Sequence, residues 1–234
     1  MEQAAPKQRS PWVYVALGCG GFALLSCLGV FLVFAFIGKK VNDLGEGLTN
    51  PTVRTENARK MLGQLPEGYL SAVSFSMLGL VDIAVLTNGE GLSDGGVEVG
   101  DRIFTYYRMM SNSENERTKA FFRSGEGDLG TLRNSGVTIE KEDIIKRGNL
   151  TVDGRRLYYV AYRGLFGVGN QQGAESGLNV ALLFDCPGEQ LHAGVWAMKD
   201  PSPQTPPAEL DLTGTVADEA VLATFVKPMN PCGR

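Results

Sequence analysis

Histidine and cysteine, the residues that most often hold zinc or carry redox chemistry, are scarce in this sequence. Among 234 residues there is one histidine, His192, and there are four cysteines. Two of these, Cys19 and Cys27, lie within an apolar stretch, which leaves Cys186 and Cys232. A Cys2His zinc site would need a spacing unlike the recognised zinc motifs, and no Cys-x-x-C pair is present. We therefore predict no metal site, no cofactor and no thiol-based redox catalysis.

An excess of positive charge is also missing. Residues 41–234 contain 18 basic and 25 acidic side chains, which gives a net charge of −7. Proteins that bind nucleic acid neutralise phosphates with clustered Lys and Arg, and this part of the chain shows no basic stripe. We predict that nucleic acid is not a partner.

Charge of either sign is absent from residues 12–37, a run of 26 positions. A helix needs roughly 20 apolar residues to cross a bilayer core, so this run predicts a retained single-pass anchor with the lipid bilayer as a partner. Trp12 and Tyr14 are expected at one membrane interface, and Lys39 and Lys40 at the other.

Two other interpretations of this run are open. A cleaved signal peptide would have an unusually long apolar region and no A-x-A site after it, and a lipoprotein signal ending at Cys27 would leave an apolar mature end. The positive flanks nearly balance, so they do not decide the orientation.

The preferred organisation has four parts, with the large domain outside the cytoplasm. These are a short cytoplasmic tail (1–11), the anchor (12–37), a linker with a juxtamembrane helix (38–64) and an extracytoplasmic α+β domain (65–234). The alternative is a cytoplasmic domain in which both of its cysteines are reduced.

The pattern after the linker predicts an antiparallel α+β fold. The expected order is a helix, three strands, a helix, two hairpins and a final helix. Short turns between strands favour antiparallel pairing, and we expect the helices at 113–124 and 216–227 to cover one face of the sheet. The expected segments are a helix at 51–64, strands at 82–88 and 102–110, hairpins at 137–152/155–164 and 178–185/190–198, and the two helices just named.

Two short motifs and this order of elements resemble the PsbP-type fold, named for an extrinsic photosystem II subunit and found in small bacterial envelope domains. The motifs are Pro66-Glu67-Gly68-Tyr69, which is similar to the P-x-G-Y/W segment of that family, and Val152-Asp153-Gly154-Arg155, which is similar to its V-x-G-R/K hairpin. The resemblance covers about residues 65–228. It implies a binding or assembly factor and supplies no catalytic motif.

One motif offers an enzymatic alternative. Residues 91–95 fit G-x-S-x-G, the nucleophile elbow of α/β-hydrolases, with Ser93 as nucleophile and His192 as base. The elbow requires a helix directly after the serine, and here a strand pattern follows. A glycine-rich hairpin loop accounts for the same residues. The G-x-G-x-x-G match at 125–130 follows a helix and carries acidic residues, so we interpret it as a helix end.

Cys186 and Cys232 are predicted to form a disulfide if the domain lies in an oxidising compartment. Both stand in turn or tail positions beside Pro or Gly. The bond would close a loop of 46 residues and stabilise the fold by about 3–4 kcal/mol.

The sequence thus predicts a membrane-anchored protein whose domain binds or assembles with an envelope protein and has no catalytic site. The alternative is a membrane-tethered serine hydrolase using Ser93 and His192. The glycine-rich segments 89–100 and 164–177 are expected to lie near each other and to frame a binding surface, because loops carry function on such scaffolds.

Overall fold

The structure is a computed structural model. It describes residues 50–233 apart from 78–79, 90, 94–95, 99, 111, 130–131, 133–136 and 167–174, and it describes only the backbone of 91–93 and 96–98. The chain divides into two compact units, residues 1–45 and 46–234, and the description below concerns the second. The predicted anchor and its interface residues Trp12, Tyr14, Lys39 and Lys40 lie outside the described residues. Among the residues that are described, no helix combines the length and apolar character needed to cross a membrane.

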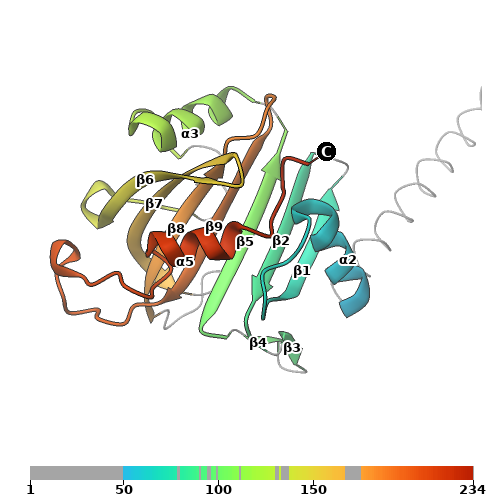
Figure 1. Cartoon of the computed structure of the whole chain (residues 1–234), viewed down its shortest axis with the longest axis horizontal. Coiled ribbons are helices and arrows are strands. Elements are labelled where there is room, and N and C mark those ends of the chain that lie inside the picture. The colour runs from blue at the N-terminus through green and yellow to red at the C-terminus, as the bar shows by residue number, and fades with distance from the viewer. Residues whose placement is uncertain are drawn as a thin grey trace, which may run out of the picture. The chain divides into compact units, whose positions relative to one another are not determined.

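The centre of the second unit is a seven-stranded sheet in which every neighbouring pair is antiparallel (Figure 1). The α+β class and the antiparallel pairing are therefore as predicted. Across the sheet the strands are β1 (Leu70–Met77), β2 (Val81–Thr87), β5 (Arg102–Met109), β9 (Leu191–Lys199), β8 (Glu175–Phe184), β7 (Arg155–Phe166) and β6 (Ile144–Val152). A separate small hairpin is formed by β3 (Gly91–Ser93) and β4 (Gly96–Glu98). The helices are α2 (Pro51–Leu62), α3 (Ser113–Ser124) and α5 (Glu219–Val226), with 3-10 turns η1 (Lys141–Asp143) and η2 (Pro207–Glu209).

The turn between β6 and β7 shows how local sequence determines the pairing. Asp153 and Gly154 both have positive φ angles, 49° and 77°. Two residues of this kind form the tight turn whose twist matches that of the flanking strands. The hairpin predicted from this dipeptide is confirmed, with Val152 paired to Arg155.

Helix ends follow the expected chemistry with one difference. Asn50 caps α2 by accepting hydrogen bonds from the backbone of Thr52 and Val53. Glu116 lies three residues after Ser113, a capping-box spacing that predicts Ser113 as the cap of α3. The structure instead uses Asn112, whose side chain accepts from the Asn115 backbone at 2.8 Å. Asn and Ser are almost equivalent caps, so the sequence alone does not select between them.

The helices lie on both faces of the sheet. Phe104 on β5 packs in the same cluster as Ala58 of α2 and Phe225 of α5. Tyr107, on the opposite side of the same strand, packs with Phe122 of α3. One face thus carries α2 and α5, and α3 covers the other, so the prediction that α3 and α5 cover the same face is wrong. Amphipathicity identifies the buried side of a helix and does not say which face of a sheet it meets.

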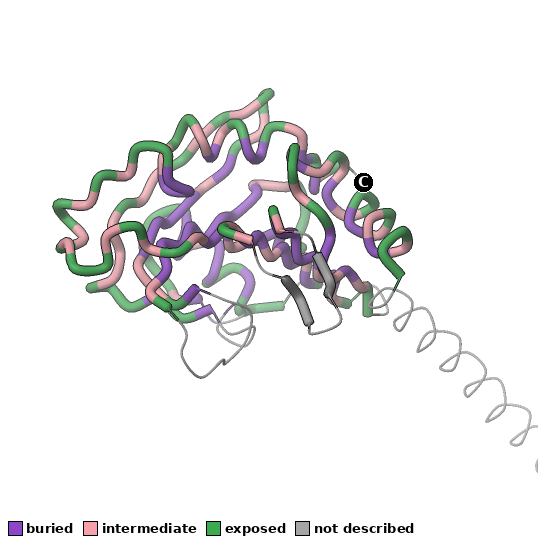
Figure 2. The backbone as a smooth tube through the Cα atoms, turned by 90° about the horizontal axis from the view of Figure 1, so that it is seen from below, coloured by how far each residue is buried: buried purple, intermediate pink, exposed green. Residues whose placement is uncertain are grey.

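Helix α2 belongs to the folded domain, so the unit begins earlier than the predicted boundary at residue 65. Ala58 and Leu62 are fully buried in the main core. Ser74 of the edge strand β1 is also fully buried, and its hydroxyl donates to the Arg54 carbonyl of α2 at 2.7 Å. Figure 2 shows the buried segments running through the middle of the molecule, with exposed residues outside them.

Candidate functional site

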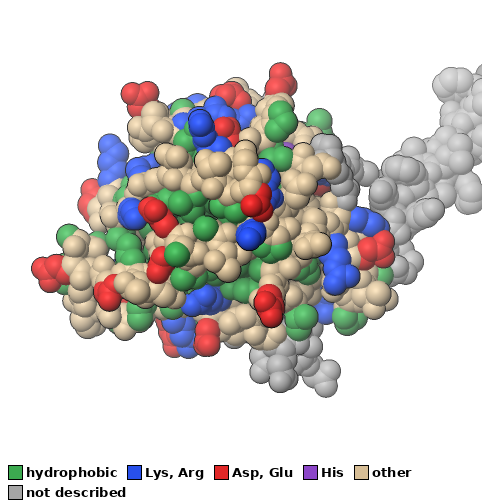
Figure 3. Space-filling view, viewed as in Figure 1, with side chains coloured by type: hydrophobic (Ala, Val, Ile, Leu, Met, Phe, Trp, Pro, Cys, Tyr) green, Lys and Arg blue, Asp and Glu red, His purple; other side chains and the backbone are tan. Residues whose placement is uncertain are grey.

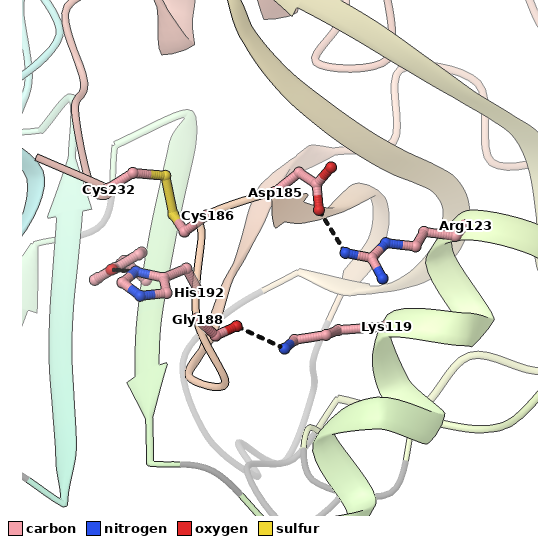
Figure 4. The surroundings of a disulfide bond; sticks show 8 residues. Lys119, Arg123, Asp185, Cys186, Gly188, His192 and Cys232 are labelled. Carbon is pink, nitrogen blue, oxygen red and sulfur yellow. Dashed lines mark hydrogen bonds and ion pairs between the residues drawn. A yellow bond between two sulfur atoms is a disulfide. The ribbon is translucent and has the colours of Figure 1, made fainter.

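The disulfide between Cys186 and Cys232 is present, as the sequence predicts. It joins the turn after β8 to the segment that follows α5, with the two Cα atoms 5.1 Å apart (Figure 4). The same turn is also held to α3 by side chains of that helix. Arg123 pairs with Asp185 at 2.5 Å, and the Lys119 ammonium donates to the Gly188 carbonyl at 3.4 Å.

The segment after α5 also closes on α2. Met229 forms an isolated antiparallel bridge with Gly63, and the Asn230 amide donates to the Leu62 carbonyl at 2.6 Å. A helix leaves its last carbonyls without partners inside the helix, so this bond satisfies one of them. Residues 227–233, which we call the C-terminal strap, therefore connect α5, α2 and the β8–β9 turn.

His192 is part of the core. It is 6% exposed, and its Nδ1 shares a hydrogen bond of 2.8 Å with the Tyr106 hydroxyl. Burial lowers the pKa of His192 to about 4, and the charges of Arg108 and Lys119 act in the same direction. The imidazole is thus neutral at pH 7. Because both sulfurs of Cys186 and Cys232 are in the disulfide, no thiolate is available for the Cys2His zinc site considered above.

The hydrolase alternative finds no geometric support. Ser93 ends β3, pairs with Gly96 and is followed by β4, where a nucleophile elbow needs a helix. The β3–β4 hairpin projects beyond the end of the sheet at which Arg102 begins the pairing of β5 with β9 (Figure 1). His192 pairs with Arg108, which lies six residues further along β5, or about 20 Å from that end at about 3.4 Å per residue. A nucleophile and its base need hydrogen-bonding contact, so the hydrolase stays a prediction from the motif alone.

The G-x-G-x-x-G match behaves as a helix end. Gly125 adopts the left-handed conformation that closes α3, and its amide donates to the Phe121 carbonyl at 3.1 Å. This is the ordinary role of glycine after a helix. Gly130, the last glycine of the match, lies outside the described residues.

An open groove of about 890 Å³ lies between α5 and the segment that connects α2 to β1, and it could hold a ligand. Both motifs that carry the family resemblance contribute to it, although they are far apart in the chain. We call it the α5 groove. Its lining is Gln64, Leu65, Pro66, Glu67, Tyr69, Arg102, Asp153, Trp196, Ala220, Val221, Thr224, Phe225, Lys227 and Pro228.

Aromatic side chains form a rigid floor under the α5 groove. The rings of Trp196 and Phe225 are stacked, with centroids 3.8 Å apart and planes within 9°. Tyr69 meets Phe225 edge-on at 5.0 Å and accepts a hydrogen bond of 2.9 Å from the Trp196 indole. Burial raises the pKa of Tyr69, and the Trp196 hydrogen bond and the charge of Arg102 oppose that shift. These contacts fix the floor before any ligand arrives.

The rim of the groove is mixed in charge. Arg102 lies over the Trp196 ring, 5.7 Å from its centroid, and donates to the Gly214 carbonyl at 3.1 Å. Glu67, Asp153 and Lys227 are exposed at the sides. Figure 3 shows this face of the molecule, with hydrophobic side chains along its middle among basic and acidic ones.

The two glycine-rich segments begin and end at the same end of the sheet. Arg102, which follows segment 89–100, pairs with Met198, and Met198 pairs in turn with Leu178, which follows segment 164–177. The interior residues 167–174 lie outside the described residues. That these segments frame a binding surface stays a prediction.

Comparisons with protein-family models, with curated proteins and with solved structures found no match to this chain. The resemblance to the PsbP-type fold therefore stays a prediction from the short motifs and the order of elements.

Proposed function

We propose that this chain is a single-pass membrane protein whose extracytoplasmic domain binds an envelope protein without catalysing a reaction. The observation that carries the proposal is the α5 groove, with its stacked floor of Trp196 and Phe225. Sites that bind other molecules are concave and largely apolar, with a few polar groups that set orientation. The groove has this composition.

The membrane anchor and the location outside the cytoplasm rest on one further observation each. Residues 12–37 are long and apolar enough for an anchor. The Cys186–Cys232 disulfide would persist in an oxidising compartment and would be rare in a reducing one.

The groove suits a binding role because its floor is already ordered. Trp196 and Phe225 are 1% and 5% exposed, so these rings are already fixed in the core. A partner would contact the more exposed lining residues above them, such as Val221 and Thr224, without having to order the floor. Burying one apolar side chain of the partner would contribute about 1.5–3 kcal/mol. A few such contacts support a specific complex of moderate affinity.

Photo-crosslinking in native membranes tests the binding surface. A photoreactive residue replacing Thr224, which lines the groove, is expected to give a discrete adduct with a partner protein. Thr138 is the matched control, because it is an exposed threonine flanked by Val137 and Ile139, which pack on the α3 face. The adduct should disappear when Val221→Asp is added. Equal adducts at both positions would contradict the proposed surface.

Peptide mass spectrometry without reduction tests the compartment. Free thiols are alkylated before the native membranes are opened. A linked pair of peptides containing Cys186 and Cys232 supports the extracytoplasmic placement, whereas complete alkylation of both cysteines would place the domain in a reducing compartment and contradict it.

A further inference from the structure

Arg102 lines the α5 groove, and no carboxylate of the described residues forms an ion pair with it. Its guanidinium has five N–H donors, and the structure shows one hydrogen bond from it, to the Gly214 carbonyl. Other arginines of the described chain pair with aspartates: Arg108 with Asp82, Arg117 with Asp128, Arg123 with Asp185, Arg155 with Asp153 and Arg163 with Asp200. The positive charge at the groove is thus left for a ligand.

The backbone and side chain of Arg102 are both held in place. Its amide donates to the Asn88 side chain at 2.9 Å, and the residue begins β5 paired with Met198. The guanidinium lies over the Trp196 face, within the range of a cation–π interaction. A cation positioned in this way loses little conformational freedom when it binds an anion.

The surrounding charges restrict which anion fits. Glu67 and Asp153 also line the groove, and residues 41–234 carry a net charge of −7. A phosphate or a nucleic acid would bring several negative charges close to these carboxylates and would be repelled. A single carboxylate matches the planar fork of one guanidinium, which can hold it through two parallel hydrogen bonds.

Building on the proposed function, we propose that the α5 groove binds a peptide segment that places a carboxylate on Arg102 and a neighbouring apolar side chain between Leu65 and Val221. Leu65 is partly exposed on the connecting segment and Val221 is partly exposed on α5. The apolar contact would supply affinity, and the carboxylate would set the orientation of the peptide. The carboxylate is either a chain terminus or an acidic side chain.

Three matched pools of degenerate octapeptides test this inference against the full chain held in lipid nanodiscs. The first pool has free C-terminal carboxylates and no acidic residue, the second has amidated ends and one Asp or Glu, and the third has amidated ends and no acidic residue. Retained peptides are quantified by mass spectrometry. We expect the first or the second pool to be retained about tenfold more than the third, because a hydrogen bond to a charged group has that effect. The preferred pool identifies the source of the carboxylate.

Two variants, each with a matched control, separate the carboxylate contact from the groove itself. Arg102→Gln should bring all three pools to equal retention, and Arg117→Gln, an exposed arginine on α3, should leave the preference intact. Thr224→Trp should fill the groove and reduce retention of every pool. Thr138→Trp, at the exposed threonine of the α3 face, should not.

The outcomes distinguish the two proposals. Equal retention of the three pools by the native chain, lost in Thr224→Trp, would overturn the carboxylate contact and leave the groove as a binding surface. A preference that survives in Arg102→Gln would also overturn it. Retention no greater in the native chain than in Thr224→Trp would overturn both the inference and the proposed use of the groove.

Discussion

Removing the disulfide is expected to destabilise the domain substantially, and the size of the effect follows from the loop that it closes. Replacing both Cys186 and Cys232 by serine opens a loop of 46 residues. The chain-entropy model assigns about 4 kcal/mol to a loop of this length at 25 °C. Single domains have a free energy of unfolding of about 5–15 kcal/mol, so the loss is a large fraction of the total. For a domain of this size the midpoint of thermal unfolding should fall by about 10 °C.

The loss should appear first in the C-terminal strap. The Asn230 amide, bonded to the Leu62 carbonyl, is held near the disulfide by the strap alone. Its hydrogen exchange should accelerate in the double serine variant. The amides of β8 and β9, at the centre of the sheet, should exchange only through global unfolding.

Two measurements on the full chain in detergent test this prediction. Urea unfolding followed by Trp196 fluorescence gives the change in the free energy of unfolding, and hydrogen exchange read by mass spectrometry locates it. The control replaces Cys19 and Cys27 by serine, since both belong to the other unit of the chain, residues 1–45, and should leave the urea midpoint unchanged. A double variant at 186 and 232 within about 1 kcal/mol of the native chain would refute the entropic reasoning.

Three further substitutions test the core beneath the groove and the buried histidine. Because the pKa of His192 is lowered to about 4, the unfolded chain binds a proton at this residue more readily than the folded chain does. The free energy of unfolding should therefore fall by about 2–3 kcal/mol as pH drops from 6.5 toward 4. His192→Gln should remove that part of the pH dependence of the urea midpoint, and an equal pH dependence in the variant and the native chain would contradict the prediction. Phe225→Ala should cost about 3–5 kcal/mol in urea unfolding and shift Trp196 emission to longer wavelength, since the two rings are stacked. Gly194→Ala should cost about 1–3 kcal/mol in the same assay, because its new Cβ would lie 2.6 Å from the Phe104 ring; a neutral result for either would contradict the packing described.

The elements that could be predicted from the sequence are those set by neighbouring residues. Asp153-Gly154 predicts its turn because few other dipeptides accept two positive φ angles. The start of α2 is also predictable, because Asn50 is a favoured capping residue and Pro51 suits the first turn of a helix. The pairing of Cys186 with Cys232 was predictable because the chain offers no other cysteine outside the apolar run.

The features that escaped prediction depend on contacts between distant segments. The helical pattern of α3 does not reveal that Phe122 packs on the face opposite to Phe225. The groove was missed because Tyr69, Trp196 and Phe225 each resemble an ordinary core residue when taken singly. The segment Pro66-Glu67-Gly68-Tyr69 resembles a motif of the PsbP-type fold, but no local feature of the sequence indicates that it forms one wall of the groove.

The contact between Leu62 and Asn230 has a consequence for biosynthesis. At about 5–20 residues per second, the ribosome adds Asn230 on the order of ten to thirty seconds after Leu62. During that interval α2 has neither its Met229 bridge nor its final carbonyl partner. The packing of α2 on β1 and β2 can form soon after its synthesis, but the end of the helix that follows the predicted anchor is completed only when the strap arrives.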